Sequence, residues 1–545
     1  MPTSEPIRGA DTLARALRAA GVETIFAMSG NQIMIAFDAF LEAQIKPIHV
    51  RQEAAAVHMA DATAQLTDSV GVAIVPAGPG FANALSALYT ARMSESPVVL
   101  LSGHAPVARL GMGAFQEMPQ ATMAESFAKA SWTVRDASDV AASVARAIQI
   151  ARSGRPGPVH VAVPEDVLAA PAEDPSHLTE ESFHKAPLML DEATGQKVVD
   201  TLAAAKRPLI LTGPRLGRGD GLRVAKALEA ATGIPVVCME SPRGTKDPCL
   251  GAFAEVLAEA DTILALGKLM DFSVQLGAAL HPDCKIVNID PEPEMLERSC
   301  TVLGPRVAVA AEAGTISAAE QIIACADDRL RADPDWAQEV QQAIAYRPEA
   351  WQSVTSRDGA LHAVELCRTV QARLDASPDS ILIVDGGEFG QWAQACLSAP
   401  NRIINGPAGA IGSGIPYAVA AGLAKPGAPV IALMGDGSAG FHLSELDTAA
   451  RANAPFTLII GNDARWNAEY QIQLRDYGEQ RLHSCELNPT RYDEVAATFG
   501  CHGENVTSLA ELDAALDRAA ESGRPACLNV TIESHPAPVV QRQSA

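Results

Sequence analysis

The sequence predicts an α/β protein built from three doubly wound parallel-sheet domains. Its 545 residues are too many for one ordinary hydrophobic core, and a chain of this length typically forms about three domains. Short runs rich in Val, Ile and Leu alternate with amphipathic helical segments, a pattern typical of parallel sheets covered by helices. Polar, turn-rich stretches over 164–187 and 330–360 interrupt this alternation. We therefore expect domains over 1–170, 190–345 and 361–535.

The expected strands fall in three groups along these domains. Helical patterns lie between them, for example over 54–65 and 83–93. The first and third groups are similar in size and pattern, which suggests two related layers. Strands are expected over 47–50, 70–75, 97–102 and 158–163, then over 208–213, 234–239, 261–267 and 284–290, and finally over 380–387, 429–437, 456–463 and 526–532.

The composition limits the class of partner. The formal charge is −23 and no long basic run occurs, which argues against nucleic acid or an anionic membrane as the main partner. No apolar run is long enough to cross a membrane, and the N-terminal segment lacks the apolar core of a secretory signal. The ten cysteines are scattered and form no CxxC pair, which favours free thiols. These features predict a cytoplasmic protein, and they give no positive clue to its substrate.

The clearest chemical signal is Gly435-Asp436-Gly437-Ser438, which directly follows an apolar run. Glycines let a ligand approach the backbone closely, and the next helix presents free N–H groups to an anion. Asp436 can hold a hard divalent cation that also binds phosphate oxygens. A plain strand-to-helix turn has the same residues, so the motif alone leaves both interpretations open.

A second acidic turn favours the metal interpretation. The apolar run over 456–461 ends at Asn462-Asp463. The segment from Asp436 to Asp463 has the length of one helix and one strand, so both carboxylates should lie at the carboxyl edge of adjacent parallel strands. Two such ligands, together with diphosphate oxygens, suit octahedral Mg²⁺.

In these two turns the chain resembles the thiamine diphosphate-dependent enzymes, whose metal motif is GDG followed one helix and strand later by an Asn pair. Here Asp463 stands where the second Asn of the pair is usual, and its carboxylate still supplies an oxygen ligand. The resemblance implies that the backbone carbonyl of Arg465 is the third protein ligand. It implies thiamine diphosphate and Mg²⁺ as cofactors.

Glu53 carries the second part of the resemblance. It follows a short apolar run and opens a helical pattern, and taken alone it is a typical solvated acid at a helix start. In the family, a glutamate here contacts a ring nitrogen of the cofactor's aminopyrimidine and stabilises its imino form, which then acts as the base. The resemblance therefore implies that Glu53 activates the cofactor.

Four further segments match the family in order. The turn from Gly78 to Asn83 resembles the one near the pyrimidine ring. Ala114-Phe115-Gln116-Glu117 matches the AFQE segment of acetolactate synthases, which implies that Phe115 and Gln116 line the reaction site.

The other two segments lie in the third domain. Gly386-Gly387-Glu388-Phe389 corresponds to residues near the diphosphate, where Glu388 is an awkward neighbour for an anion and is expected to point away. Gly409-Ala410-Ile411-Gly412 matches the segment whose bulky residue wedges between the two cofactor rings. A plain core isoleucine remains an alternative for Ile411.

The resemblance covers nearly the whole chain. It implies a pyrimidine-binding domain over 1–170, a central domain over 190–345 and a diphosphate-binding domain over 361–535. In the family, the residues matching Glu53 and Asp436 in one active site come from different subunits. A homodimer or homotetramer is therefore expected, in line with the symmetry of soluble oligomers.

The position within the family is mixed. The motifs are similar to those of acetolactate synthases, benzaldehyde lyase and the 2-hydroxyacyl-CoA lyases with oxalyl-CoA decarboxylase. Ile472 falls where acetolactate synthases carry an aromatic specificity residue, Ser29 falls where benzaldehyde lyase has a histidine, and Trp466 resembles benzaldehyde lyase and some acyl-CoA lyases. We expect an acetolactate synthase-like lyase, carboligase or transferase acting on 2-oxo acids, 2-hydroxy ketones or acyl-CoAs. A 2-oxo acid or oxalyl-CoA-type decarboxylase and a regulatory subunit without turnover are the alternatives.

The central domain leaves its ligand open. In the family it binds FAD, ADP or CoA, or nothing. Arg243, Lys246 and Lys268 lie in loops where a nucleotide would bind and could meet its phosphates, or they are ordinary surface cations.

Overall fold

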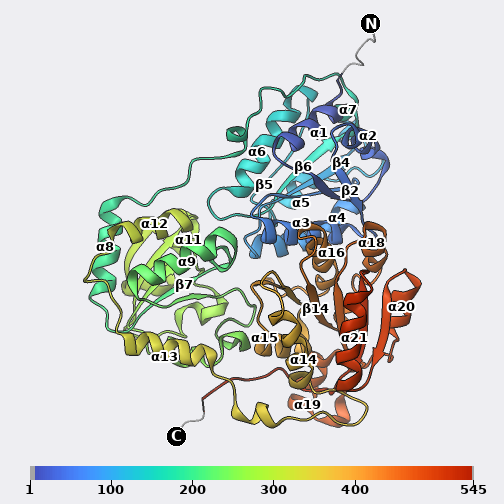
Figure 1. Cartoon of the computed structure of the whole chain (residues 1–545). Coiled ribbons are helices and arrows are strands. Elements are labelled where there is room, and N and C mark those ends of the chain that lie inside the picture. Colours follow the sequence, from blue (N-terminus) through green and yellow to red (C-terminus); the bar gives the residue numbers. More distant parts are fainter. Residues whose placement is uncertain (1–6, 543–545) are drawn as a thin grey trace. The chain divides into compact units, whose positions relative to one another are not determined.

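The computed structural model of the chain describes residues 7–542. It contains three all-parallel sheets with helices between successive strands, which confirms the predicted α/β class. The chain forms two compact units (Figure 1), the first ending at Ala186 and the second beginning at Pro187 and holding two of the sheets. The boundaries proposed for the three domains stay a prediction.

The first sheet has the strand order β2-β1-β3-β4-β6-β5. Its central strands are completely buried because helices cover both faces of the sheet. In Figure 1, α1, α6 and α7 lie on one side of this sheet, and α3 and α4 lie on the other. Its strands are β1 (Thr24–Ala27), β2 (Lys46–His49), β3 (Gly71–Val75), β4 (Val98–His104), β5 (Ala130–Thr133) and β6 (Val159–Pro164), and its helices are α1 (Gly9–Ala19), α2 (Met34–Glu42), α3 (Glu53–Thr67), α4 (Pro79–Met93), α5 (Gln120–Ala124), α6 (Val140–Arg152) and α7 (Glu165–Ala169).

The third sheet has the order β13-β12-β14-β15-β17-β16. Numbered within its own group of six, each of these two sheets reads 2-1-3-4-6-5, so the two related layers expected from the sequence share one topology. The strands of the third sheet are β12 (Ile381–Val384), β13 (Asn401–Ile404), β14 (Val430–Gly435), β15 (Thr457–Asn462), β16 (His502–Val506) and β17 (Ala526–Thr531), and its helices are α14 (Ala363–Asp375), α15 (Gly387–Cys396), α16 (Gly414–Ala424), α17 (Asp436–Ala439), α18 (Glu445–Ala452), α19 (Asn467–Tyr477), α20 (Tyr492–Thr498) and α21 (Leu509–Glu521).

This strand order creates a topological switch point in the third sheet. From β12 the chain passes to β13 on one side, and it then returns to β14 on the other side of β12. The loops after β12 and β14 therefore diverge and leave a crevice at the carboxyl ends of the two strands, where open α/β sheets bind ligands. Asp385 follows β12 and Asp436 follows β14, so both carboxylates lie at this edge.

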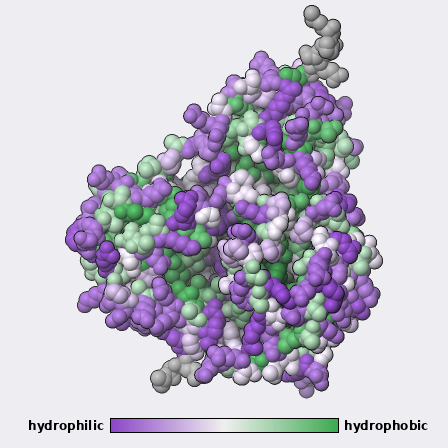
Figure 2. Space-filling view, in the orientation of Figure 1, coloured by the Kyte–Doolittle hydropathy of each residue, from purple (hydrophilic) through white to green (hydrophobic). Residues whose placement is uncertain are grey.

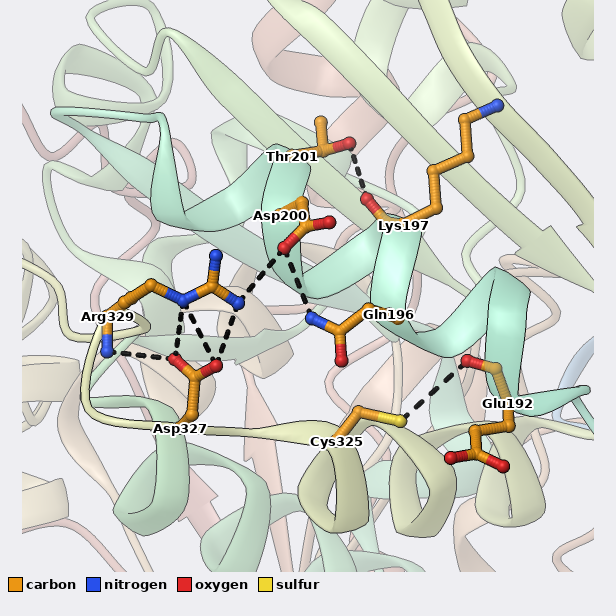
Figure 3. Close-up of polar contacts among 8 residues, drawn as sticks. All are labelled: Glu192, Gln196, Lys197, Asp200, Thr201, Cys325, Asp327 and Arg329. Atoms are coloured by element: carbon orange, nitrogen blue, oxygen red, sulfur yellow. Dashed lines mark hydrogen bonds and ion pairs between the residues drawn. The ribbon is translucent and has the colours of Figure 1, made fainter.

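The central sheet has five strands in the order β11-β10-β9-β7-β8. Figure 3 shows the contact between α8 (Glu192–Ala203) and the loop that follows α12 (Thr315–Cys325). In this loop Arg329 pairs with Asp327 at 2.8 Å, and it also pairs with Asp200 of α8 at 3.2 Å. These groups are exposed, so the pairs add little stability. The strands are β7 (Pro208–Thr212), β8 (Val236–Cys238), β9 (Thr262–Leu266), β10 (Lys285–Asp290) and β11 (Val307–Glu312), and the helices are α8 (Glu192–Ala203), α9 (Gly219–Thr232), α10 (Phe253–Leu257), α11 (Pro293–Leu303), α12 (Thr315–Cys325) and α13 (Pro334–Ala345).

The visible surface is mainly hydrophilic. Figure 2 shows hydrophilic side chains over most of the visible face, with hydrophobic residues in scattered patches. Among residues 7–542, no helix is both long enough and apolar enough to cross a membrane.

Candidate active site

The two acidic turns predicted to bind metal lie side by side. Strands β14 and β15 pair in parallel with Gly435 opposite Gly461, so the turns that follow them start at the same level. Asp436 opens α17 and is only 2% exposed. Within the described part of the chain, no group donates a hydrogen bond to its buried Oδ2 atom. A buried carboxylate oxygen without a donor is costly unless a cation binds it.

Burial shapes the charge of both carboxylates. It raises the pKa of Asp436 to about 7, and the nearby negative charge of Asp463 adds to this rise. Burial likewise raises the pKa of Asp463 to about 6, although a hydrogen bond with Ser534 and the charge of Arg465 oppose it. Two acids that are desolvated and repel each other are a suitable donor pair for a divalent cation, which removes the repulsion.

The pair does not form a complete cage of protein ligands. Across residues 7–542, no three His, Cys, Asp or Glu side chains gather in a way that could hold a metal ion. Mg²⁺ commonly binds through one or two carboxylates and takes its other ligands from water and phosphate oxygens. A Cβ added at Gly435 or Gly387 would meet no atom within 4 Å, so both glycines border open space. The donor set therefore fits Mg²⁺ bound together with a diphosphate.

Neighbouring residues shape the metal turn. The side chain of Asn462 donates to Asn529 at 3.0 Å and accepts from the N–H of Ala464 at 3.1 Å, which fixes the bend. The Arg465 guanidinium stacks 4.3 Å from the centre of the Tyr470 ring, so its side chain is directed to α19.

Gly437, the last glycine of the motif, faces Trp466. A Cβ at Gly437 would lie 2.8 Å from the Trp466 ring, so a larger residue does not fit there. Ser438 follows within α17 and is buried.

The predicted diphosphate segment begins α15. Gly387 has a φ of +84°, a conformation that favours glycine, and Gly386 precedes the helix as its N-cap. The Glu388 carboxylate lies 3.2 Å from the Arg243 guanidinium of the central segment. Burial raises the pKa of Glu388, and the charge of Arg243 opposes this rise.

Phe389 lies deeper than its neighbours. Its ring covers Gly461, where a Cβ would come within 2.6 Å of the ring, and Phe389 belongs to the hydrophobic core.

Gly409 has a φ of +66°, and a Cβ there would lie 3.4 Å from Pro242. Ile411 packs over Gly386: a Cβ at Gly386 would lie 2.7 Å from its Cγ2 atom. Two of the predicted segments, 386–389 and 409–412, thus meet at Gly386.

In the first unit, the structure brings Glu53 and the turn at 78–83 together. Glu53 is the first residue of α3, whose N-cap Gln52 accepts N–H bonds from Ala54 and Ala55 at 2.6 and 3.2 Å. Asn83 of α4 donates from Nδ2 to Oε2 of Glu53 at 3.0 Å. A Cβ added at Gly80 would lie 3.1 Å from Glu53 Oε1. One carboxylate is therefore held at the start of two helices.

The AFQE segment contacts the same turn. A Cβ at Gly78 would lie 2.7 Å from the carbonyl oxygen of Gln116, and Gly78 also has a φ of +58°, so both space and conformation require glycine. The Gln116 side chain accepts a hydrogen bond from Gln32 at 2.8 Å. Phe115 beside it is 76% exposed.

A buried polar network beneath this turn was not predicted from the sequence. Gln120 accepts the N–H of Gly78 at 2.8 Å and donates to Ser102 Oγ at 2.7 Å. Ser102 and Ser131 bond the two ring nitrogens of His160, at 2.7 and 2.8 Å. Burial lowers the pKa of His160 to about 3, so this histidine is neutral. The sequence shows Gln120 only as a polar residue just after the AFQE segment.

Comparison with known proteins agrees with this geometry. Residues 7–124 match the N-terminal TPP binding domain of thiamine pyrophosphate enzymes, residues 196–319 match their central domain, and residues 385–530 match their C-terminal TPP binding domain. The chain therefore belongs to the thiamine pyrophosphate (thiamine diphosphate) enzyme family, as its motifs predict.

The relatives place the chain within one branch of that family, that of acetolactate synthases and 2-hydroxyacyl-CoA lyases. It is 33% identical to the acetolactate synthase large subunit IlvG of Mycobacterium tuberculosis, over 95% of this chain and 94% of that protein. It is 31% identical to 2-hydroxyacyl-CoA lyase 2 of Bos taurus, over 97% of this chain and 91% of that protein. The human 2-hydroxyacyl-CoA lyase 2 is 30% identical, over 96% of this chain and 90% of that protein.

Proposed function

We propose that the protein is a thiamine diphosphate- and Mg²⁺-dependent lyase or transferase that breaks or forms a carbon–carbon bond next to a carbonyl. Its substrates are 2-oxo acids, 2-hydroxy ketones or acyl-CoAs. The observation that carries this proposal is the placement of Glu53, held by Asn83 at the start of α3 beside the glycine turn at 78–80. A carboxylate in this position can share a proton with a heteroaromatic ring nitrogen.

The residues of the third domain anchor the anionic end of the cofactor. Asp436, Asp463 and the backbone carbonyl of Arg465 hold Mg²⁺. The segments Gly386–Gly387 and Gly435–Ser438, at the starts of α15 and α17, would hold the diphosphate. The N–H of Gly386 is not one of the free donors, because it is bonded to Asp385. Glu388 is directed to Arg243, which keeps its charge away from the diphosphate.

When bound, thiamine diphosphate supplies a carbon nucleophile that attacks a carbonyl. Glu53 would share a proton with the bound pyrimidine ring, and Ile411 would support the bound cofactor. Phe115 and Gln116 line the substrate side, and the exposed ring of Phe115 is available to cover an apolar part of the substrate. In this arrangement, Glu53 and Asp436 of one site come from two subunits of a homodimer, which can pair into a homotetramer.

Hydrogen–deuterium exchange at the thiazolium carbon tests the function directly. The protein loaded with thiamine diphosphate and Mg²⁺ should exchange fast, and Glu53→Gln should slow it by about 100-fold or more because general acid–base groups contribute on that order. Glu125→Gln removes an exposed carboxylate of the same unit and should leave the rate unchanged. Slow exchange in the wild-type protein would point instead to a regulatory subunit without turnover.

The substrate class has a separate test. The chain is similar both to proteins named acetolactate synthase and to proteins named 2-hydroxyacyl-CoA lyase, so both substrate classes remain candidates. Nucleotide released from the purified, denatured protein distinguishes them. FAD favours a synthase, ADP or CoA favours an acyl-CoA lyase or an oxalyl-CoA-type decarboxylase, and neither favours a simpler lyase.

A further inference from the structure

A buried carboxylate lies beneath two of the loops that face the cofactor. Asp385 directly follows β12 and is 1% exposed. Its side chain accepts three backbone hydrogen bonds: from Gly386 at 2.6 Å, and from Gly412 and Gly414 at 2.9 Å each. Gly386 belongs to the diphosphate segment, Gly412 ends the segment that carries Ile411, and Gly414 begins α16. One side chain therefore joins segments that are far apart in the sequence.

The start of α16 offsets part of the cost of burying this carboxylate. Burial raises the pKa of Asp385 to about 6, and the hydrogen bonds from Gly414, Gly386 and Gly412 oppose that rise. Gly414 is the first residue of α16, an 11-residue helix, and its N–H is one that the helix itself cannot bond. A negative charge at a helix N-terminus is stabilised by the helix dipole. A Cβ at Gly414 would lie 3.1 Å from Asp385 Oδ2, so the close approach requires glycine.

Gly412 is held from its other side by His442. The Nδ1 atom of His442 lies 2.8 Å from the carbonyl oxygen of Gly412. Because a carbonyl only accepts, Nδ1 carries the proton and donates it. Burial lowers the pKa of His442, so the ring is neutral. Gly412 has a φ of +93°, and a Cβ there would come within 2.4 Å of Phe441, so both backbone conformation and space require glycine at this position.

These contacts fix the residue before Gly412. Ile411 packs its Cγ2 atom over Gly386, whose N–H is bonded to the same Asp385 carboxylate. A shift of Gly412 would therefore move Ile411 relative to the diphosphate segment. We propose that Asp385 and His442 are positioning residues that fix the position of Ile411 relative to the diphosphate segment. This inference rests on the proposed function, because the contact between Ile411 and the cofactor rings is part of that proposal.

The test compares two substitutions at His442. His442→Leu removes the donor to Gly412, whereas His442→Asn keeps one, because the amide nitrogen of asparagine can replace Nδ1. Each variant is saturated with thiamine diphosphate and Mg²⁺. The readouts are the cofactor dissociation constant, the circular dichroism of the bound imino form of the pyrimidine, and the deuterium exchange rate at the thiazolium carbon.

We expect His442→Leu to slow exchange and weaken the imino signal by about tenfold, the equivalent of one lost hydrogen bond, while His442→Asn restores both. Asp385→Asn replaces one acceptor oxygen by a donor that faces two of the three N–H groups, and it should weaken cofactor binding as well. If Asp385→Asn fails to fold, the His442 pair carries the test alone.

Three results are decisive in different ways. Equal exchange and equal imino signal in wild-type protein and His442→Leu would overturn the inference. Equal losses in His442→Leu and His442→Asn would overturn it too, because the donor would then be irrelevant. A wild-type protein that binds thiamine diphosphate but does not exchange would instead overturn the proposed function.

Discussion

Asn83 donates a hydrogen bond to Glu53 at 3.0 Å and so ties the start of α4 to the start of α3. This bond orients the carboxylate that we propose to activate the cofactor. Asn83→Ala should slow deuterium exchange at the thiazolium carbon by about tenfold, the effect of one lost hydrogen bond to a charged group. Ser86→Ala, on the exposed side of the same helix, is the control and should exchange at the wild-type rate. An unchanged rate in Asn83→Ala would show that Glu53 needs no orienting partner.

The metal turn predicts opposite effects with and without Mg²⁺. Asp436→Asn removes a buried charge that has no donor at Oδ2, so the metal-free protein should gain about 1 kcal/mol or more in unfolding free energy. With thiamine diphosphate and Mg²⁺ present, the same variant should be less stable than the wild-type protein, because it binds the metal less tightly. Urea unfolding with EDTA and with saturating cofactor measures both. Destabilisation in both conditions would contradict the assignment.

Variants of Asp463 test whether this residue is a metal ligand or only shapes the turn. Asp463→Asn keeps an oxygen ligand and should retain most of the Mg²⁺ affinity, whereas Asp463→Ala should lose about tenfold or more. Magnesium titration of cofactor binding gives the two constants. Asp328→Asn, at an exposed position of the second unit, is the matched control. Full affinity in Asp463→Ala would remove this residue from the metal site.

His160 makes the stability of the first unit depend on pH. Burial lowers its pKa from 6.5 to about 3, so the unfolded chain binds the proton more readily than the folded one. The stability is therefore complete above pH 6.5 and is lost as the pH falls toward 3, by up to about 1.4 kcal/mol per pH unit. His160→Gln, which replaces the titrating ring by a neutral amide, should flatten this part of the profile. Urea unfolding between pH 7 and pH 5 makes the comparison, and parallel profiles would contradict the prediction.

Gln120 should contribute to the stability of the first unit. Gln120→Leu leaves the buried N–H of Gly78 and the hydroxyl of Ser102 without this partner, which should cost about 1–3 kcal/mol of unfolding free energy. Gln149→Leu removes an amide of α6 that donates to the backbone carbonyl of Ser182, and it should cost less because Gln149 is only half-buried. Chemical unfolding of the two variants, read by fluorescence, compares them.

The sequence alone predicts most of the sheets. All twelve expected apolar runs coincide with strands, since buried parallel strands are nearly continuous in hydrophobic residues. Five strands were not predicted. Four of them, β5, β11, β13 and β16, lie at sheet edges, where partial exposure admits polar residues, as in His502–Val506. The fifth, β1, lies inside its sheet between β2 and β3, so edge exposure does not explain why it was missed.

The candidate site also contains some features that the sequence predicts and others that it does not. The adjacency of Asp436 and Asp463 follows from the length between them and from the parallel strands, and both can be read from the chain. The roles of Asp385, Gln120 and His442 cannot, because each bonds a backbone group that only folding brings near. Nothing in the local sequence distinguishes these three from ordinary polar residues.

The shared strand order of the first and third sheets suggests how such a site can arise. A cofactor with a flat heterocycle at one end and a charged diphosphate at the other needs two chemically different binding sites. One topology used twice provides two crevices of the same construction, each at its own switch point. Divergence then has only to change a few loop residues, toward an amide and a carboxylate in one copy and toward glycines and aspartates in the other. An ancestral duplication of a single ligand-binding layer is sufficient to explain both ends.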